Sequence, residues 1–232
     1  MKKKILVLGS RHDSIVPNLE FDEVYVANSA AINALKYKKK FPHIKIICCS
    51  AGLVFDKNPI CRNSILDLDP DEIHFRSFPT RNIDLKKTKI NILTKKEQRK
   101  MQYSFFKLNM LSLIIAESKY RKKNLRETFK YFYESLIRNS FLGTSTGLFS
   151  VLLAIDKHKN NCDIFISGIG FDGGAYFFSN LEDHVGRHLV DKYIIQNALK
   201  SKFKKNITTF DMDTSVLAGI RHQKIDVSDT IL

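Results

Sequence analysis

No apolar run in this 232-residue sequence approaches the roughly 18 to 20 residues that a membrane-spanning helix requires. After the basic start Met1 to Lys4, only about five apolar residues precede Gly9, too few for the core of a secretory signal peptide. The four cysteines are Cys48, Cys49, Cys61 and Cys162. Their spacing matches no metal-binding motif, so we expect reduced, structural thiols. These absences predict a cytoplasmic protein.

Several ligand-binding signatures are also missing. The sequence contains neither a P-loop nor the aromatic RNP motif of RNA-binding domains. The Asp-x-Asp sequence near the C-terminus, at Asp211 to Asp213, follows a late strand, and we interpret it as a helix cap. We therefore predict no metal site and no cofactor, and we do not expect nucleic acid as the partner.

Acidic residues are few compared with basic ones. The 24 Asp and Glu residues against 38 Lys and Arg residues give a net charge of +14. This excess indicates a negatively charged partner, which charge alone leaves open among a nucleotide, a nucleic acid, an acidic glycan and an anionic membrane face. A hydrophobic content of 44% excludes a disordered chain, and the length fits one domain, 1–232.

Strand-like runs alternate with helical segments along the chain. The runs at 3–8, 23–27, 44–49 and 72–78 are predicted strands, and 29–40 has helical spacing. This alternation is typical of an α/β fold with a mainly parallel sheet and helices on its faces, the Rossmann-like class.

A long helical insertion is predicted at about 95–140, because this region contains many Lys and aromatic residues and almost no helix breaker. A polar cluster suggests a break near 120–124. We interpret the aromatic residues as core packing, with a surface for acceptor or membrane contact as the alternative. The basic cluster around the break is either a solvated turn or a binding site for phosphates or anionic lipid. Its residues are Lys119, Arg121, Lys122, Lys123 and Arg126.

The segment Gly143 to Gly147 has three consecutive hydroxyl residues before an apolar helical run. Free backbone N–H groups and the positive end of the helix dipole meet at such a helix start, which favours an anion. A simple helix N-cap is the alternative, because Ser and Thr are common caps. The strand-like run at 164–172 contains Ser-Gly-Ile-Gly at 167–170, a second glycine-containing turn at the edge where open α/β sheets bind ligands.

A loop with two glycines and an aromatic tip follows, and we interpret 171–184 as a lid that closes over a ligand. The segment 181–200 is a predicted helix. On it His184, His188 and Asp191 share one stripe, so Asp191 can orient the imidazole of His188. A general base, a satisfied core histidine and a metal-binding histidine pair all remain open for these residues.

Taken in order, these motifs resemble the bacterial sialyltransferases of glycosyltransferase family 42. The resemblance rests on the glycine-containing first turn, the Asn after the second strand, the Ser/Thr-Gly helix start, the Ser-Gly-Ile strand end and the His-rich helix. It covers most of the chain except about 55–140. The first turn reads Gly-Ser-Arg-His-Asp-Ser where the family favours Gly-Asn-Gly-Pro-Ser, and the acidic residue after the strand end is displaced to Asp172.

The resemblance implies the fold of a sialyltransferase-like GT-A variant, a CMP-activated donor and a set of site residues. The residues implied to bind nucleotide or sugar are Gly9, Ser10, Arg11, Asn28, Ser29, Thr144, Ser145, Thr146, Gly147, Gly168, Ile169, Gly170 and Asp172. The implied base is His188, with Asp191 to orient it and His184 as the competing histidine, and Tyr176 is the implied hydroxyl for the leaving phosphate.

The expected activity is therefore inverting, metal-independent transfer of sialic acid or a related ulosonic acid from its CMP-activated donor to a bacterial surface glycan or glycolipid. A Kdo transferase is the alternative of the same class. A non-catalytic nucleotide-binding or RNA-binding protein is the alternative of a different class. We also expect peripheral contact with an anionic membrane, and a homo-oligomer is left open.

Overall fold

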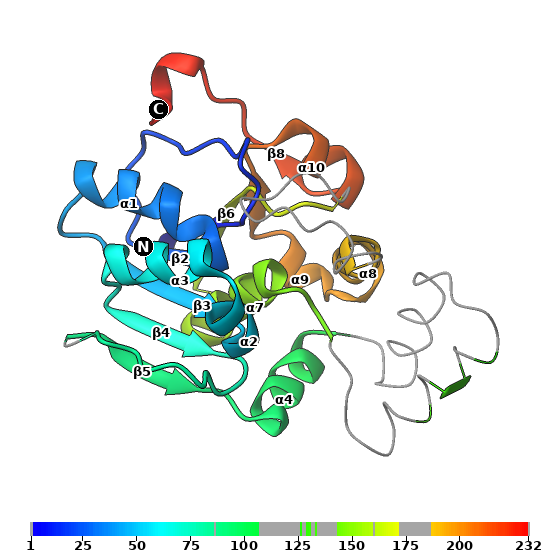
Figure 1. Cartoon of the computed structure of the whole chain (residues 1–232). Helices are drawn as coiled ribbons and strands as arrows, with labels where there is room; N and C mark the ends of the chain where they lie inside the picture. The colour runs from blue at the N-terminus through cyan, green and yellow to red at the C-terminus, as the bar shows by residue number, and fades with distance from the viewer. Residues whose placement is uncertain are drawn as a thin grey trace.

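Eight parallel strands form one sheet in the computed structural model of the protein, in the order β5-β4-β3-β2-β1-β6-β7-β8 (Figure 1). The structure describes residues 2–85, 87–106, 126, 129–130, 133, 143–159, 161–171 and 187–231. The strands are β1 (Lys3–Leu8), β2 (Glu23–Ala27), β3 (Lys45–Ser50), β4 (Glu72–Phe75), β5 (Lys89–Ile92), β6 (Cys162–Ser167), β7 (Ile207–Thr209) and β8 (Arg221–His222). The predicted α/β, Rossmann-like class is confirmed.

The central strands carry buried apolar side chains on both faces, because both faces of the sheet are covered. In β1, Ile5 and Val7 belong to one hydrophobic cluster, whereas Leu6 and Leu8 belong to the other. All four side chains are fully buried. Successive side chains of a strand point to opposite faces of the sheet, so one strand contributes to two hydrophobic cores, one on each face.

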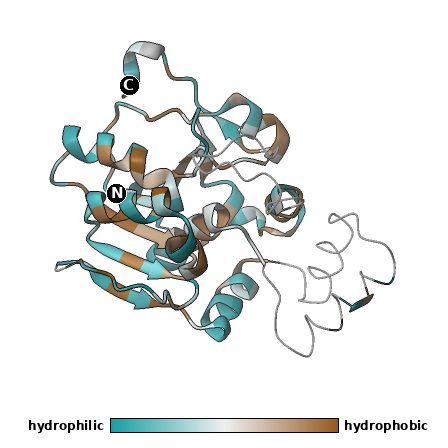
Figure 2. Cartoon of the chain, viewed as in Figure 1, coloured by the Kyte–Doolittle hydropathy of each residue, from teal (hydrophilic) through white to brown (hydrophobic). Residues whose placement is uncertain are grey.

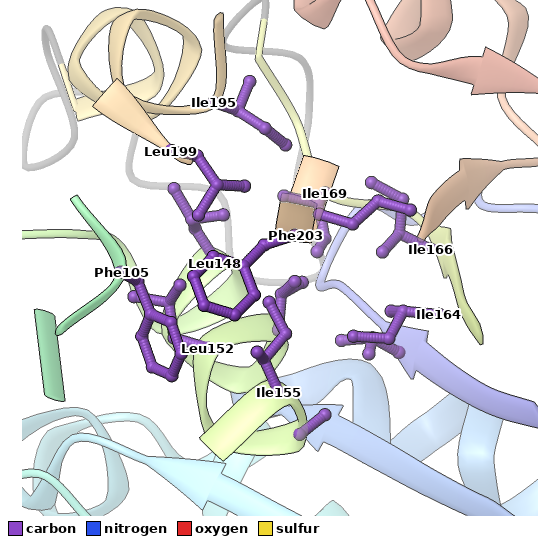
Figure 3. Close-up of a cluster of buried hydrophobic side chains, with 14 of the residues drawn as sticks. Phe105, Leu148, Leu152, Ile155, Ile164, Ile166, Ile169, Ile195, Leu199 and Phe203 are labelled. Atoms are coloured by element: carbon purple, nitrogen blue, oxygen red, sulfur yellow. The ribbon is translucent and has the colours of Figure 1, made fainter. Parts of the chain in front are cut away.

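One face carries α1 (Ala31–Lys40) and α3 (Pro59–Leu68), and the opposite face carries α7 (Thr146–His158) with η3 (Ile194–Ala198) and α9 (Ser201–Lys204). Figure 3 shows the second core, where leucines of α7 meet isoleucines of β6. The remaining elements are η1 (Asn28–Ala30), α2 (Gly52–Lys57), α4 (Lys95–Phe105), α8 (Arg187–Tyr193), α10 (Met212–Ala218) and η4 (Val227–Asp229).

The strand order reverses between β1 and β6, which pair in parallel from Lys3 with Cys162 to Leu8 with Ser167. The chain leads outward from β1 to β5, then returns through α7 to β6 on the other side of β1. Open α/β sheets bind ligands at the carboxyl edge beside such a reversal. The fold therefore places the candidate site at the ends of β1 and β6.

Several predicted boundaries were wrong. The strand expected at 72–78 ends at Phe75, and the helix expected to run to Lys200 gives way to a π-helical turn and an extended Leu199. The helix beginning at Lys95 ends at Phe105, because Phe106 is extended and forms a bridge with Leu199. A tertiary contact between distant segments thus ends both helices, which local sequence preference does not reveal.

The aromatic residues of the predicted insertion divide into two groups. Phe105 and Phe106 are 4% exposed and pack in the core, as expected, whereas Tyr103 is 43%, Phe129 70% and Tyr133 64% exposed. The expectation of core packing is therefore wrong for these last three residues. The predicted break at 120–124 and all of the basic cluster except Arg126 lie outside the described residues.

Helix α4 meets the core with polar side chains. Figure 2 shows that hydrophobic residues gather on the central strands, whereas α4 is largely hydrophilic. Its buried residues are Gln98, Gln102 and Phe105. Two glutamines four positions apart share one helix face, so α4 can form side-chain hydrogen bonds with the segments that it packs against.

Two further findings concern the cysteines and the helices. All four cysteines are buried free thiols, as predicted. Among the described residues, no helix combines the length and the hydropathy needed to cross a membrane.

A group of charged residues lies at the amino edge of the sheet, opposite the candidate site. The carboxylate of Glu72 accepts from Lys45 Nζ at 2.7 Å and Lys157 Nζ at 3.2 Å. Glu23 lies 2.9 Å from Lys3 Nζ and also accepts from the hydroxyl of Tyr25. Burial would raise the pKa of Glu72, but the hydrogen bonds from the two lysines outweigh it and lower the pKa to about 2.

We predict that Glu72→Gln lowers the free energy of unfolding at pH 7 by about 1–2 kcal/mol, allowing for solvent screening of the partly exposed lysines. Because the folded-state pKa is depressed, this contribution is present above the ordinary value of 4.5 and is lost as the pH falls towards about 2. Urea unfolding at several pH values should show the variant and the wild type converging below pH 4.

Asp163→Asn is the matched control, because Asp163 forms an exposed ion pair with Lys2 at 3.3 Å. We expect it to change stability by less than about 0.5 kcal/mol. Equal losses in the two variants would contradict a specific role for Glu72.

Candidate functional site

Two glycine turns meet at the carboxyl ends of β1 and β6. The N–H of Gly9 donates to the carbonyl of Ser167 at 2.7 Å, and the N–H of Arg11 donates to the carbonyl of Gly168 at 3.1 Å. A Cβ on Gly9 would overlap the carbonyl of Gly168. Gly168 itself has a φ of +69°, and a Cβ there would overlap Ser14. The two glycines are therefore required by the contact between the turns, whatever ligand lies nearby.

Asp211, which follows β7, closes this junction. Its carboxylate accepts from the N–H of Gly168 at 2.8 Å and from the hydroxyl of Ser167 at 3.3 Å. Asp211 is the N-cap residue of α10, as predicted, but its side chain makes no capping hydrogen bond to that helix and turns to the end of β6 instead. The Gly168 N–H is free to take the carboxylate because the left-handed turn has left the strand ladder. Burial raises the pKa of Asp211, although the Gly168 N–H and the nearby Arg11 charge favour the ionised form.

The predicted residues after β1 have intramolecular partners. The hydroxyl of Ser10 donates to the carbonyl of Ala27, at the end of β2, at 2.7 Å. Arg11 makes two hydrogen bonds to the carboxylate of Asp13, from Nε at 2.9 Å and from Nη2 at 2.7 Å. The hydrogen bond from Arg11, opposed by partial burial, lowers the pKa of Asp13. The guanidinium is thus partly neutralised beside the strand reversal.

The predicted residues after β2 lie in the adjacent turn. Asn28 has a φ of 50°, and its side-chain carbonyl accepts from the hydroxyl of Ser50 at 3.1 Å. The hydroxyl of Ser29 is fully buried and has no hydrogen-bond partner among the described residues. The hydrogen bond between Asn28 and Ser50 joins the ends of β2 and β3 at the same edge of the sheet.

Helix α7 begins as predicted within the hydroxyl-rich segment. Ser145 is its N-cap, with the Ser145 hydroxyl accepting from the N–H of Leu148 at 3.2 Å. No acceptor for the N–H groups of Thr146 and Gly147 is found in the described part of the chain. Gly147 faces Ile169 of the turn after β6, since a Cβ there would lie 3.4 Å from Ile169 Cγ2. The helix start therefore combines two open N–H groups with a position beside the turn after β6.

The peptide group between Thr144 and Ser145 is held from both ends. Arg76 Nη1, just after β4, donates to the carbonyl of Thr144 at 2.8 Å. The N–H of Ser145 donates to Asp191 Oδ1 of α8 at 2.9 Å. Gln102 of α4 accepts from the N–H of Thr144 at 3.2 Å. Thr144 and Asp191 are 0% and 1% exposed, so these bonds form in a dry environment where each is strong.

The bond between Ser145 and Asp191 brings the two predicted functional regions together. His188 precedes Asp191 by three residues on α8, so it lies on the helix that contacts the hydroxyl-rich turn. The expectation that Asp191 also orients the imidazole of His188 stays a prediction. Among the described residues, no group of three or more His, Cys, Asp or Glu side chains could hold a metal ion.

Of the other predicted site residues, two are buried and three lie outside the described residues. Ile169 is 3% exposed, and Gly170 is also buried. Asp172, Tyr176 and His184 lie outside the described residues, as does nearly all of the predicted lid.

Sequence reasoning missed Arg76, Gln98 and Gln102 as site residues, and it missed the role of Asp211. Arg76 lies inside the strand predicted at 72–78, but the strand ends at Phe75, so Arg76 follows it at the carboxyl edge. Gln98 and Gln102 had only their spacing of four as a signal. Asp211 was noticed, but the sequence does not show that its carboxylate turns back towards β6.

Comparison of the chain with protein-family models, curated proteins and solved structures finds no match. The functional argument therefore depends on the residues and their geometry.

We predict that Gly9→Ala and Gly168→Ala each lower the free energy of unfolding by about 3 kcal/mol or more, because the added methyl group overlaps backbone or Ser14. Gly147→Ala should change it by less than about 1 kcal/mol, because its methyl group fits at ordinary contact distance. Urea unfolding of the three variants measures this difference. Similar stabilities would show that the two turns can separate at little cost.

Proposed function

We propose that the protein is an inverting glycosyltransferase that transfers sialic acid or a related ulosonic acid from its CMP-activated donor to a bacterial surface glycan. The observation that supports this proposal best is the 2.9 Å hydrogen bond between Ser145 N–H and Asp191. It joins a helix start suited to phosphate with a helix that carries a histidine. These are the two groups that such a transfer requires.

In the proposed site, the donor phosphate binds at the start of α7. The N–H groups of Thr146 and Gly147 and the positive end of the helix dipole stabilise its negative charge. The cytidine and the sugar then extend over the carboxyl ends of β1 and β6, near Ser10 and Ile169. The helix is 13 residues long, so its dipole is well developed.

The proposed chemistry needs one proton acceptor. The acceptor hydroxyl attacks the anomeric carbon of the acidic sugar, a new C–O bond forms, and the bond from that carbon to the phosphate oxygen breaks. Cytidine monophosphate leaves with the electron pair, and His188 takes the proton of the attacking hydroxyl. A histidine is suited to this step because its ordinary pKa lies near neutral pH. Positioned general bases contribute about 10²–10⁴-fold.

The excess of basic residues supports two further parts of the proposal. A net charge of +14 favours an anionic donor and contact with an anionic membrane surface, where a glycolipid acceptor would be found. The same charge would also suit a non-catalytic RNA-binding protein, so the experiment includes RNA binding.

We predict that the purified protein releases cytidine monophosphate from CMP-sialic acid or from CMP-Kdo. Release from only one donor identifies the sugar class. With an acceptor glycan present, His188→Ala should lower kcat at least 100-fold and leave donor KM within about threefold, because the base acts in the transition state. His188→Gln and His184→Ala are assayed beside it.

Loss of transfer in His184→Ala alone would assign the base to His184. No release from either donor, no thermal stabilisation by cytidine monophosphate and salt-sensitive RNA binding would together overturn the transferase proposal in favour of the RNA-binding alternative.

A further inference from the structure

The Thr144–Ser145 peptide group lies between two oppositely charged side chains. The guanidinium of Arg76 donates to its carbonyl at 2.8 Å, and the carboxylate of Asp191 accepts from its N–H at 2.9 Å. In a trans peptide the C=O and N–H bonds point in opposite directions. The cation thus binds the negative end of the peptide dipole, and the anion binds the positive end. Both bonds are charge-assisted, and each polarises the peptide in the sense that strengthens the other.

The side chain of Arg76 is held in place by several contacts. Arg76 Nε donates to Gln98 Oε1 at 3.2 Å, and Gln98 Nε2 in turn donates to the carbonyl of Arg76. The guanidinium carbon lies 4.5 Å from the centroid of the Phe149 ring, on the first turns of α7. Gln98 is 8% exposed. The position of Arg76 is therefore determined by α4 and α7 together, and it has little freedom to follow a displaced Thr144.

The carboxylate of Asp191 connects Arg76 and the Thr144–Ser145 peptide group to α8. Asp191 is 1% exposed, and an ionised carboxylate at that depth needs strong donors. Helix α8 continues directly into η3, and Val190 packs in the same core as Ile194 and Ile195. Beside this apolar packing, Asp191 gives α8 a polar contact with the start of α7.

We propose that Arg76 and Asp191 form a pair of positioning residues, which act through the Thr144–Ser145 peptide group to hold α8, and with it His188, against the donor-binding turn. We refer to these two residues and the peptide between them as the peptide clamp. The role in transfer rests on the proposed function. The mechanical link from Arg76 to α8 does not, because it is a property of the folded chain alone.

The kinetic test is a double-mutant cycle with Arg76→Met and Asp191→Asn. Met keeps an apolar stem over Phe149, and Asn keeps an oxygen that can accept from Ser145 N–H. Each variant should lower kcat about 10- to 100-fold, since small misplacements of reacting groups cost that much. Donor KM should stay within about threefold or fall. The double variant should be no worse than the weaker single variant within about threefold, because the clamp acts as a unit.

Arg62→Met is the matched control. Arg62 of α3 also donates to a backbone carbonyl, that of Asp56 at 3.2 Å, but on the opposite face of the sheet. Removing it should leave kcat and KM within about twofold. Independent, multiplying losses of kcat in the Arg76 and Asp191 variants would overturn the clamp, as would a loss confined to KM.

Amide hydrogen exchange tests the same link without a substrate. Arg76→Met should accelerate exchange in 187–193 and at Ser145 at least tenfold, whereas Arg62→Met should not. Unchanged exchange in 187–193 would overturn the proposal even if the enzyme is active. Faster exchange in a protein that releases no cytidine monophosphate would retain the mechanical link and reject the proposed function and the clamp's role in transfer.

Discussion

The parallel arrangement of the sheet is the constraint on which the rest of the structure depends. Because all eight strands run in one direction, the segments after β1, β2, β4, β6 and β7 reach the same edge. Residues as distant in sequence as Ser10, Arg76 and Asp211 are thereby brought to one side of the molecule. The opposite edge collects the strand starts, and there the charges pair with one another around Glu23 and Glu72.

At the carboxyl edge, the carboxylates of two aspartates bind backbone N–H groups. Asp211 accepts from Gly168, and Asp191 accepts from Ser145. In each case the N–H belongs to a turn where regular hydrogen bonding stops, so a side chain is needed to satisfy it. The same residues that complete the backbone hydrogen bonds therefore also fix the shape of the candidate site. Rigid support of this kind is what a reacting constellation needs.

Much of the fold was predictable, because strand burial and helix periodicity are local signals. The strands at 3–8 and 23–27 and the helix start after Ser145 follow from such patterns. The ends of α4 and of the π-helical turn were not predictable, since both depend on the bridge between Phe106 and Leu199. Of the site, the sequence indicated Ser145 and Asp191 separately. Their contact spans 46 positions and comes from the return of the chain through β6, which no local pattern contains.

The start of α7 already holds one anion from the chain itself, and this changes how the anion site should be understood. The Asp191 carboxylate accepts a hydrogen bond from the N–H of Ser145, and the Ser145 hydroxyl accepts one from the N–H of Leu148. At this helix start, the N–H groups of Thr146 and Gly147 are then the two without an acceptor among the described residues. A phosphate bound there would lie near the Asp191 carboxylate, and the two negative charges would repel each other. Arg76 lies on the other side of the same peptide group and supplies a compensating positive charge. The Arg76 guanidinium therefore has two effects. It holds the turn at Thr144 in place, and it lowers the electrostatic free energy of placing a second anion beside Asp191. Replacing Arg76 removes both effects at once. Asp191→Asn separates them kinetically: the neutral amide holds Ser145 more weakly than the carboxylate does, which lowers kcat, while the repulsion of the donor phosphate disappears, which lowers donor KM.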